Sequence, residues 1–205
     1  TRGETHRKNT QQKEKNENDH IRQVHAERRS RYTTAVEQLA NEKAPVRLGG
    51  IYTLTGLVDE WLADDSLTKD KQKEEGQVII NNLCSYIRSP FPLAEKIDEY
   101  EARKELKELE SKKLNTLLPD ESPKLNALRK RFEDSAEYQE PDNIAALQAV
   151  FHEEQDVRRA IFEEMSKRSS RVGVDKSMEV TVTPGAWSCF KFDFSRAPIF
   201  YPLNN

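Results

Sequence analysis

The sequence predicts a mainly α-helical protein that contains a long charged helical hairpin and a short β segment near its C-terminus. Through most of the chain, apolar residues recur every three or four positions, which is the period of an amphipathic helix. No glycine interrupts the chain between Gln77 and Val172. The last nineteen residues, in contrast, hold six of the sixteen aromatic residues, and apolar and polar residues alternate before and within them.

The N-terminal part predicts a polar segment followed by a helix. Residues 1–18 are almost wholly polar and are expected to be frayed, whereas a helix is expected from Asp19 to Asn41. The apolar residues of this helix lie on one narrow stripe: Ile21, Val24, Tyr32, Ala35 and Leu39. A stripe of this kind favours packing on another helix, either in the same chain or in a second copy of it.

A second helix is expected from about Pro45, because the N–H that proline lacks has no partner in the first turn of a helix. Its broad apolar face indicates a helix that packs on a core, through Leu48, Ile51, Leu54 and Trp61. Gly49 and Gly50 lie inside this helix, where each costs about 1 kcal/mol relative to alanine. We expect them to admit another helix at close range. A phosphate site is disfavoured, since neither a phosphate-loop lysine nor a following strand accompanies them.

A third helix is expected from Lys71 to Arg88, and the prolines at positions 90 and 92 end it. Residues 19–92 therefore predict one helical unit that resembles a HEAT repeat with a flanking helix. A single unit of this type cannot bury both of its faces, so it should pack on other elements.

Residues 93–171 predict a charged helical hairpin or bundle. A first helix is expected over residues 94–118, and a turn follows at Pro119–Pro123. A second helix then runs to about Tyr138, and a third runs from Asp142 to about Ser169. Their apolar stripes are narrow, and many Glu and Lys residues are spaced so that they can pair along a helix.

Residues 172–205 predict a short β segment. Met178–Thr183 alternates as a strand does, Pro184 and Gly185 form a turn, and Phe190–Phe194 alternates again. The chain then divides into two quintets, 192–196 and 197–201, with Phe194 and Ile199 at their centres.

These quintets resemble the start of a pentapeptide-repeat fold, and an earlier segment strengthens the resemblance. Arg31–Leu39 and the following Val46–Tyr52 are similar to the helical segment that precedes the repeats in many bacterial pentapeptide-repeat proteins, and this similarity extends to about Phe91, including Leu83–Arg88. The resemblance implies that a right-handed β-helix begins near the C-terminus. Its inward-facing repeat-entry core would comprise Phe192, Phe194, Ala197 and Ile199, although Phe192 departs from the small residue that the family has there.

Composition restricts the function classes. The formal charge of −3 is spread without a basic block, so nucleic-acid binding is not expected. No apolar run is long enough to cross a bilayer, although several relatives of the resembled family carry a membrane-spanning hairpin before the first helix. Cys84 and Cys189 are too far apart in sequence for a disulfide framework or a metal motif, which favours a reducing, cytoplasmic location, at the inner face of the membrane if an anchor precedes this segment.

Catalytic and metal-binding patterns are weak. His20 and His25 face different sides of a helix. His152 and Asp156 share a face, but a metal would need further ligands, and a solvated helix face with ion pairs is the favoured interpretation. Ser188 and Cys189 have no histidine nearby in sequence. The sequence therefore predicts no enzyme, cofactor or metal site, and the weakest alternative is a metal protein that uses the His152 region.

We expect a non-catalytic structural domain that caps or positions a pentapeptide-repeat β-helix. The alternative is a free-standing helical adaptor that binds a protein partner through its hairpin. Either version is compatible with a homodimer formed by the stripe of residues 19–41.

Overall fold

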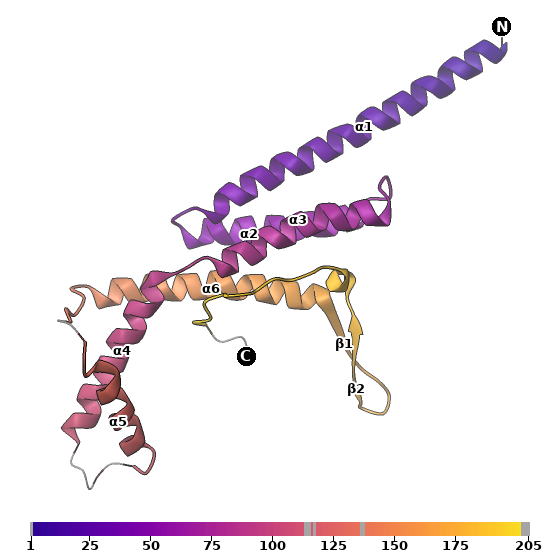
Figure 1. The fold of residues 1–205 in the computed structure, drawn as a ribbon. Helices are drawn as coiled ribbons and strands as arrows, with labels where there is room; N and C mark the ends of the chain where they lie inside the picture. The colour runs from indigo at the N-terminus through magenta and orange to yellow at the C-terminus, as the bar shows by residue number, and fades with distance from the viewer. Residues whose placement is uncertain (1, 113–115, 117, 136–137, 202–205) are drawn as a thin grey trace. The chain divides into compact units, whose positions relative to one another are not determined.

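The computed structural model describes residues 2–112, 116, 118–135 and 138–201 (Figure 1). The chain forms two compact units. Unit 1 comprises residues 1–89 and 156–205, and unit 2 comprises residues 90–155. The described residues are mainly α-helical, with one small antiparallel sheet near the C-terminus, which confirms the predicted class at that level. The sequence-based boundaries differ, because the second half of the last helix belongs to unit 1.

Unit 1 is built on three consecutive helices: α1 (Arg2–Leu39), α2 (Ala44–Leu62) and α3 (Lys69–Arg88). Helix α1 packs on α2, and α2 packs on α3. Pro45 lies in the first turn of α2, as predicted, and the Thr68 side chain caps α3 by accepting a hydrogen bond from the Lys71 N–H. Short turns join the three helices, which favours packing between sequence neighbours.

Helix α1 begins at Arg2, which differs from the expected start near Asp19. The described side chains up to His20 are exposed, so this part of the helix has no apolar face to bury. From Ile21 onward, partly buried residues recur at helical spacing, and Ala35 and Leu39 are buried. The predicted stripe is therefore present, and its residues from Tyr32 to Leu39 pack in the core of unit 1.

The core of unit 1 brings together residues from both ends of the chain. Helices α2 and α3 supply Ile51, Leu54, Ile80 and Leu83, none of which is exposed to solvent. The second half of helix α6 (Ile144–Ser169) and the aromatic tail complete the same cluster, through Val157, Ile161, Met165, Trp187 and Phe190. Such burial is the main source of stability for a small unit.

Unit 2 contains α4 (Pro92–Ser111), α5 (Glu121–Phe132) and the first part of α6. Four buried residues, Ala102, Leu109, Leu125 and Leu128, hold α4 and α5 together. Ion pairs also link the two helices, including Lys124–Glu105 at 2.5 Å and Arg129–Glu110 at 3.1 Å. Helices α4 and α5 end earlier than predicted, and residues 113–115, 117, 136 and 137 of the predicted helices lie outside the described residues.

The β hairpin consists of β1 (Ser170–Val174) and β2 (Val180–Pro184), which pair antiparallel. Alternation correctly predicted the second strand, whereas the alternation at Phe190–Phe194 does not form a strand. Strand β2 pairs with residues directly after α6, whereas residues 190–201 form no strand and run as an extended segment after the 3₁₀ helix η2 (Ala186–Cys189). This pairing is local: the turn at 175–179 is closed by the Asp175 carboxylate, which accepts hydrogen bonds from Ser177 and Glu179.

Candidate functional site

The most extensively built feature outside the helical core is the C-terminal strap, which we define as residues 187–201. It has almost no regular secondary structure, yet Trp187, Phe190 and Tyr201 are buried. An irregular segment loses conformational entropy when it is ordered, so specific contacts must hold it. Those contacts come from α2, α3 and α6.

Trp187 anchors the first end of the strap. Its side chain is fully buried, and its indole N–H donates a hydrogen bond to the Asp59 carboxylate at 2.7 Å. The other oxygen of Asp59 accepts from Arg168 at 2.8 Å, and the Arg168 guanidinium lies 5.2 Å from the centre of the Trp187 ring. One carboxylate of α2 therefore connects α6 and the strap. A buried indole N–H without such an acceptor would be unfavourable.

Phe190 continues the strap by packing on a glycine of α3. A β-carbon built on Gly76 would lie 2.5 Å from the Phe190 ring, so the missing side chain makes room for the aromatic ring. The rings of Phe190 and Trp187 meet edge to face at 6.1 Å, a favourable arrangement for aromatic pairs.

The next residue is held through its backbone. The Gln77 side chain donates to the Lys191 carbonyl at 2.8 Å and accepts from the Lys191 N–H at 2.9 Å. A side-chain amide that satisfies both groups of one residue replaces the partners that a neighbouring strand would provide. This contact depends on the extended backbone and not on the lysine side chain.

Arg88, at the end of α3, holds the strap two residues further on. Its guanidinium donates to the Asp193 carbonyl at 3.1 Å and forms an ion pair with the Asp193 carboxylate. The Ser195 hydroxyl and N–H bind the same carboxylate, and together with Arg88 they hold the pKa of Asp193 below its usual value. The Asp193 backbone also hydrogen-bonds the buried Cys84 thiol, whose pKa is raised by burial. The strap therefore covers Cys84.

Helix α6 holds the far end of the strap. Phe162 packs against Phe194 at 4.9 Å and against Tyr201 at 5.9 Å, measured between ring centroids. The buried Arg158 donates to the carbonyls of Ile87 and Ser89, at the end of α3, and lies 5.0 Å from the Phe200 ring centre. One cation therefore satisfies the C-terminal carbonyls of a helix and contacts the strap at the same time.

The predicted repeat-entry residues all lie in the strap. Phe192, Phe194 and Ala197 are partly buried against the core of unit 1, whereas the side chain of Ile199 is 56% exposed. Inward stacking of Phe192 and Ala197 in a separate coil would require them to leave these contacts. In the described part of the tail, the two quintets therefore pack against the helical unit.

The predicted helix-packing residues lie at the interfaces of α2. Ile51, Leu54 and Trp61 are buried, and Leu48 packs at the edge of the core. A β-carbon at Gly50 would lie 2.8 Å from the Ala35 carbonyl oxygen, so α1 approaches α2 closely there. Gly49, in contrast, faces open space and does not have the predicted packing role.

The segment that carries the family resemblance has a structural role in this chain. Arg31 pairs with Glu60 of α2, and the Tyr32 hydroxyl accepts a hydrogen bond from Asn82 of α3 at 2.7 Å. Ala35 is the small residue that faces Gly50. These residues fix α1 on α2 and α3.

A polar cluster reinforces the same helix contacts. Asp64 accepts hydrogen bonds from His25 and Ser66 and forms an ion pair with Arg28, while the Arg28 guanidinium lies 4.8 Å from the Trp61 ring centre. Burial raises the pKa of Asp64, but the hydrogen bonds from Ser66, Arg28 and His25 outweigh it and lower the pKa well below its usual range. The cluster is saturated by its own members, which favours a structural role.

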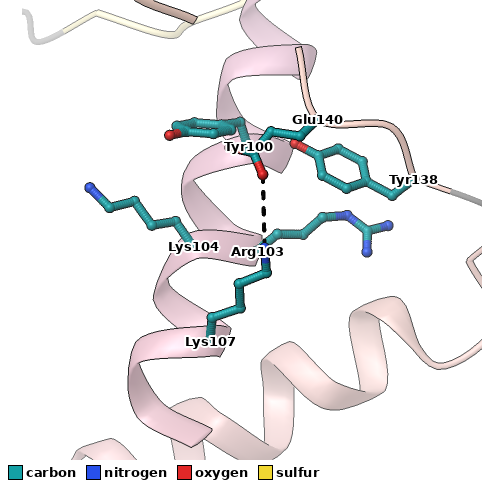
Figure 2. Close-up of a pocket in the computed structure, with 6 residues that line it drawn as sticks. All are labelled: Tyr100, Arg103, Lys104, Lys107, Tyr138 and Glu140. Carbon is teal, nitrogen blue, oxygen red and sulfur yellow. Dashed lines mark ion pairs between the residues drawn. The ribbon is translucent and has the colours of Figure 1, made fainter. Parts of the chain in front are cut away.

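Unit 2 contains a small cavity beside α4, lined by Tyr100, Arg103, Lys104, Lys107, Tyr138 and Glu140 (Figure 2). Its volume of about 60 Å³ is far below that of a pocket for a cofactor. Arg103 forms an ion pair with Glu99 and donates a hydrogen bond to the Ser135 hydroxyl. Its guanidinium also contacts the rings of Phe132 and Tyr138. Lys107 forms an ion pair with Glu140 at 3.8 Å. The cations in this cavity therefore organise the loop after α5.

The structure does not assemble the other candidate groups into a site. His152 is exposed and contacts Gln155, His25 binds Asp64, and Cys189 is exposed with its thiol on the Ala186 carbonyl. Within the described ranges, no group of three His, Cys, Asp or Glu residues could hold a metal ion. Among the helices of the same residues, none combines the length and apolarity needed to span a membrane.

A comparison with models of protein families, with curated proteins and with solved structures finds no match for this chain.

Sequence reasoning missed most of the residues that hold the strap, namely Asp59, Gly76, Gln77, Arg88 and Arg158. Gly76 carried a detectable signal, because a glycine inside a helix indicates close approach of another group. The polar residues carried none, since each looks like an ordinary charged or amide side chain on an amphipathic helix.

Proposed function

We propose that this chain is a non-catalytic structural domain in which a helical unit holds an extended C-terminal segment at a fixed place. The observation that carries the proposal is the strap of residues 187–201. Contacts from three helices bind its ring, backbone and carboxylate groups in succession, from Trp187 to Tyr201. A segment held at so many points has a fixed position relative to the helical unit.

In its more specific form, the proposal is that the unit caps or positions a β-helix of pentapeptide repeats. Support comes from the resemblance of residues 31–91 to the helical segment that precedes the repeats in that family, and from the exposure of Ile199 near the end of the strap. A β-helix that began beyond Tyr201 would start from an anchored residue, and its first coil would be protected by the preceding segment. In this version the HEAT-like arrangement of α1–α3 is the anchor.

Cys84 offers a direct test of the strap, because the strap covers this buried thiol. In a Cys189→Ser background, Gly76→Ala should displace the Phe190 ring and speed alkylation of Cys84 at least about tenfold, since local opening controls the reactivity of a buried group. Gly49→Ala is the matched control: it also replaces a helical glycine by alanine, but into open space, and should leave the rate unchanged.

A second variant separates release of the strap from general unfolding. Phe190→Ala removes the ring that a methyl group added at Gly76 would meet, so Gly76→Ala should add little to it in a double-mutant cycle. Equal Cys84 reactivity in the parent, Gly76→Ala and Phe190→Ala chains, with unchanged helicity by circular dichroism, would contradict the anchoring role.

The repeat-capping version needs its own experiment. A pentapeptide-repeat β-helix fused directly after Tyr201 should unfold at a higher denaturant concentration than the same fusion with two inserted residues, because only the first keeps the five-residue register. Equal unfolding midpoints for the two fusions would exclude capping and leave the anchoring proposal in place.

The second candidate function is a helical adaptor that binds a protein through the hairpin of α4 and α5. It is favoured by the separate small core of unit 2, whose outer surface is charged. Co-purification of a partner that is lost with Lys104→Glu and Lys107→Glu, while the strap variants retain it, would select this function.

A further inference from the structure

The ion pairs of the unit 2 cavity leave the hydroxyl group of Tyr138 unexplained. Its oxygen atom is buried and has no hydrogen-bond partner among the described residues. A buried hydroxyl without a partner costs free energy, and such a group commonly marks the place of a bound water or ion. Figure 2 shows the Tyr138 ring extending from the loop toward α4, so that the hydroxyl lies at the cavity.

Arg103 fixes the ring that carries this hydroxyl. Its guanidinium lies 4.3 Å from the centre of the Tyr138 ring and 4.2 Å from that of Phe132. The same guanidinium is paired with Glu99 and bonded to the Ser135 hydroxyl, so its charge is already balanced within the protein. Arg103 is therefore a positioning residue. It holds the Tyr138 hydroxyl in place without bonding it.

The lysines of the cavity leave one positive charge uncompensated. Lys104 and Lys107 are three residues apart on α4, so they are neighbours on its surface, and both line the cavity. Lys104 is exposed and has no ion-pair partner in the part of the chain that the structure describes. Lys107 is paired with Glu140, but at 3.8 Å and with both side chains largely exposed. Two cations against one carboxylate favour an additional anion.

The size of the cavity restricts this anion. One water molecule needs roughly 10–15 Å³ of such a space. The volume of about 60 Å³ therefore accommodates a few waters or a single small oxyanion, and it is too small for a nucleotide. A phosphate group carries several acceptor oxygens on one centre, which suits donors that come from separate side chains.

We propose that this cavity binds a phosphate group, either as the free ion or as the end of a phosphate monoester, through the Tyr138 hydroxyl and the ammonium groups of Lys104 and Lys107. Burial and the carboxylates of Glu140 and Glu99 raise the pKa of Tyr138, so the hydroxyl keeps its proton and donates. Glu140 competes with phosphate for Lys107. This inference goes beyond strap anchoring, uses no residue of unit 1 and requires no protein partner.

The test is a titration of the full chain with inorganic phosphate at neutral pH and constant ionic strength, followed by the amide chemical shifts in NMR spectra. The parent chain should bind phosphate with a dissociation constant on the order of 1 mM or below. Tyr138→Phe should weaken binding at least about tenfold, because it removes a hydrogen bond to a charged group. It should not lower the midpoint of urea unfolding, since the hydroxyl has no partner in the described chain.

Three charge variants sharpen the test. Lys104→Gln should weaken phosphate binding at least about fivefold, since it removes a cation that lines the cavity. Lys96→Gln is the matched control: it removes the same charge from α4 outside the cavity and should leave the dissociation constant within about twofold of the parent. Glu140→Gln removes the competing carboxylate and should tighten binding about threefold.

Two results would overturn the proposal. One is a parent chain that does not bind phosphate. The other is binding that Tyr138→Phe leaves intact, which would reduce it to attraction by surface lysines. Glycerol 3-phosphate distinguishes the two sources of the phosphate group. If it binds more tightly than inorganic phosphate and depends equally on Tyr138, the site takes a monoester; if it binds more weakly, the site takes the free ion.

Discussion

The hairpin and the strap are adjacent in the sequence, but they differ in whether their backbone groups pair and whether their side chains are buried. Both are extended, and in both apolar side chains alternate along the backbone. In the hairpin the backbone groups pair with each other, while the four valines remain exposed. In the strap almost no backbone pairing is regular, yet the aromatic rings are buried against three helices.

The contrast shows that backbone pairing and side-chain burial are separate sources of order. A ribbon with satisfied hydrogen bonds gains little stability from them, because water offers the same bonds in the unfolded chain. Burial of large aromatic side chains contributes more, and it can hold a segment without strands.

The largest difference is expected between Trp187→Ala and Val182→Ala. Removing a fully buried indole leaves a cavity and two groups, Asp59 and Arg168, without their aromatic partner, so the free energy of unfolding should fall by about 3–5 kcal/mol. Val182→Ala should change it by less than about 0.5 kcal/mol. Urea denaturation followed by circular dichroism measures both. Comparable losses would mean that the hairpin is part of the folded core.

The next comparison is between two aspartates whose pKa values are both lowered. Asp64 lies in the polar cluster of α1 and α2, whereas Asp175 closes the hairpin turn, where hydrogen bonds from Ser177 and Glu179 lower its pKa. A carboxyl whose folded pKa is lowered stabilises the fold above its unfolded pKa of about 4, and this stability is lost as the pH falls further.

Asp64→Asn should therefore reduce the free energy of unfolding by about 1–3 kcal/mol at pH 7 and flatten its decrease below pH 4. Asp175→Asn should do neither, since the hairpin adds little to the stability of the unit. Thermal melts between pH 7 and pH 2 provide the measurement. An unchanged pH profile in Asp64→Asn would show that the cluster does not stabilise the helix contacts.

The smallest expected effect on stability is the difference between Arg88→Ala in the strap contact and Arg171→Ala in the hairpin. Arg88→Ala removes the clamp on Asp193 and should lower the free energy of unfolding only slightly, because the ion pair is partly exposed. It should also speed Cys84 alkylation. Arg171→Ala should leave both quantities unchanged, because Arg171 lies in the hairpin and not in the strap. If Arg171→Ala speeds alkylation as well, the hairpin and the strap open together and cannot be treated as separate regions.

Local pattern predicted a large part of the fold. The period of the apolar residues located the second, third and last helices, and Pro45 correctly indicated the first turn of α2. Alternation located strand β2. These features are readable because backbone repeat and side-chain direction are set within a few residues.

Burial was less predictable, as three glycines illustrate. Gly49, Gly50 and Gly76 all lie inside helices, yet Gly50 faces the Ala35 carbonyl, Gly76 faces Phe190, and Gly49 faces open space. Their local sequence does not distinguish them, since the neighbour that matters is distant along the chain. The same holds for Gln77 and Arg88, whose partners lie more than a hundred residues away.

The sequence by itself determined the second, third and last helices and strand β2 of this protein, because these depend on local repeat and backbone preference. Only the tertiary structure decided that the aromatic side chains of the strap are buried, whereas the four valines of the hairpin are exposed. Hydrophobicity states that a side chain gains from burial, but a surface that fits it, with partners for its polar atoms, determines whether burial occurs.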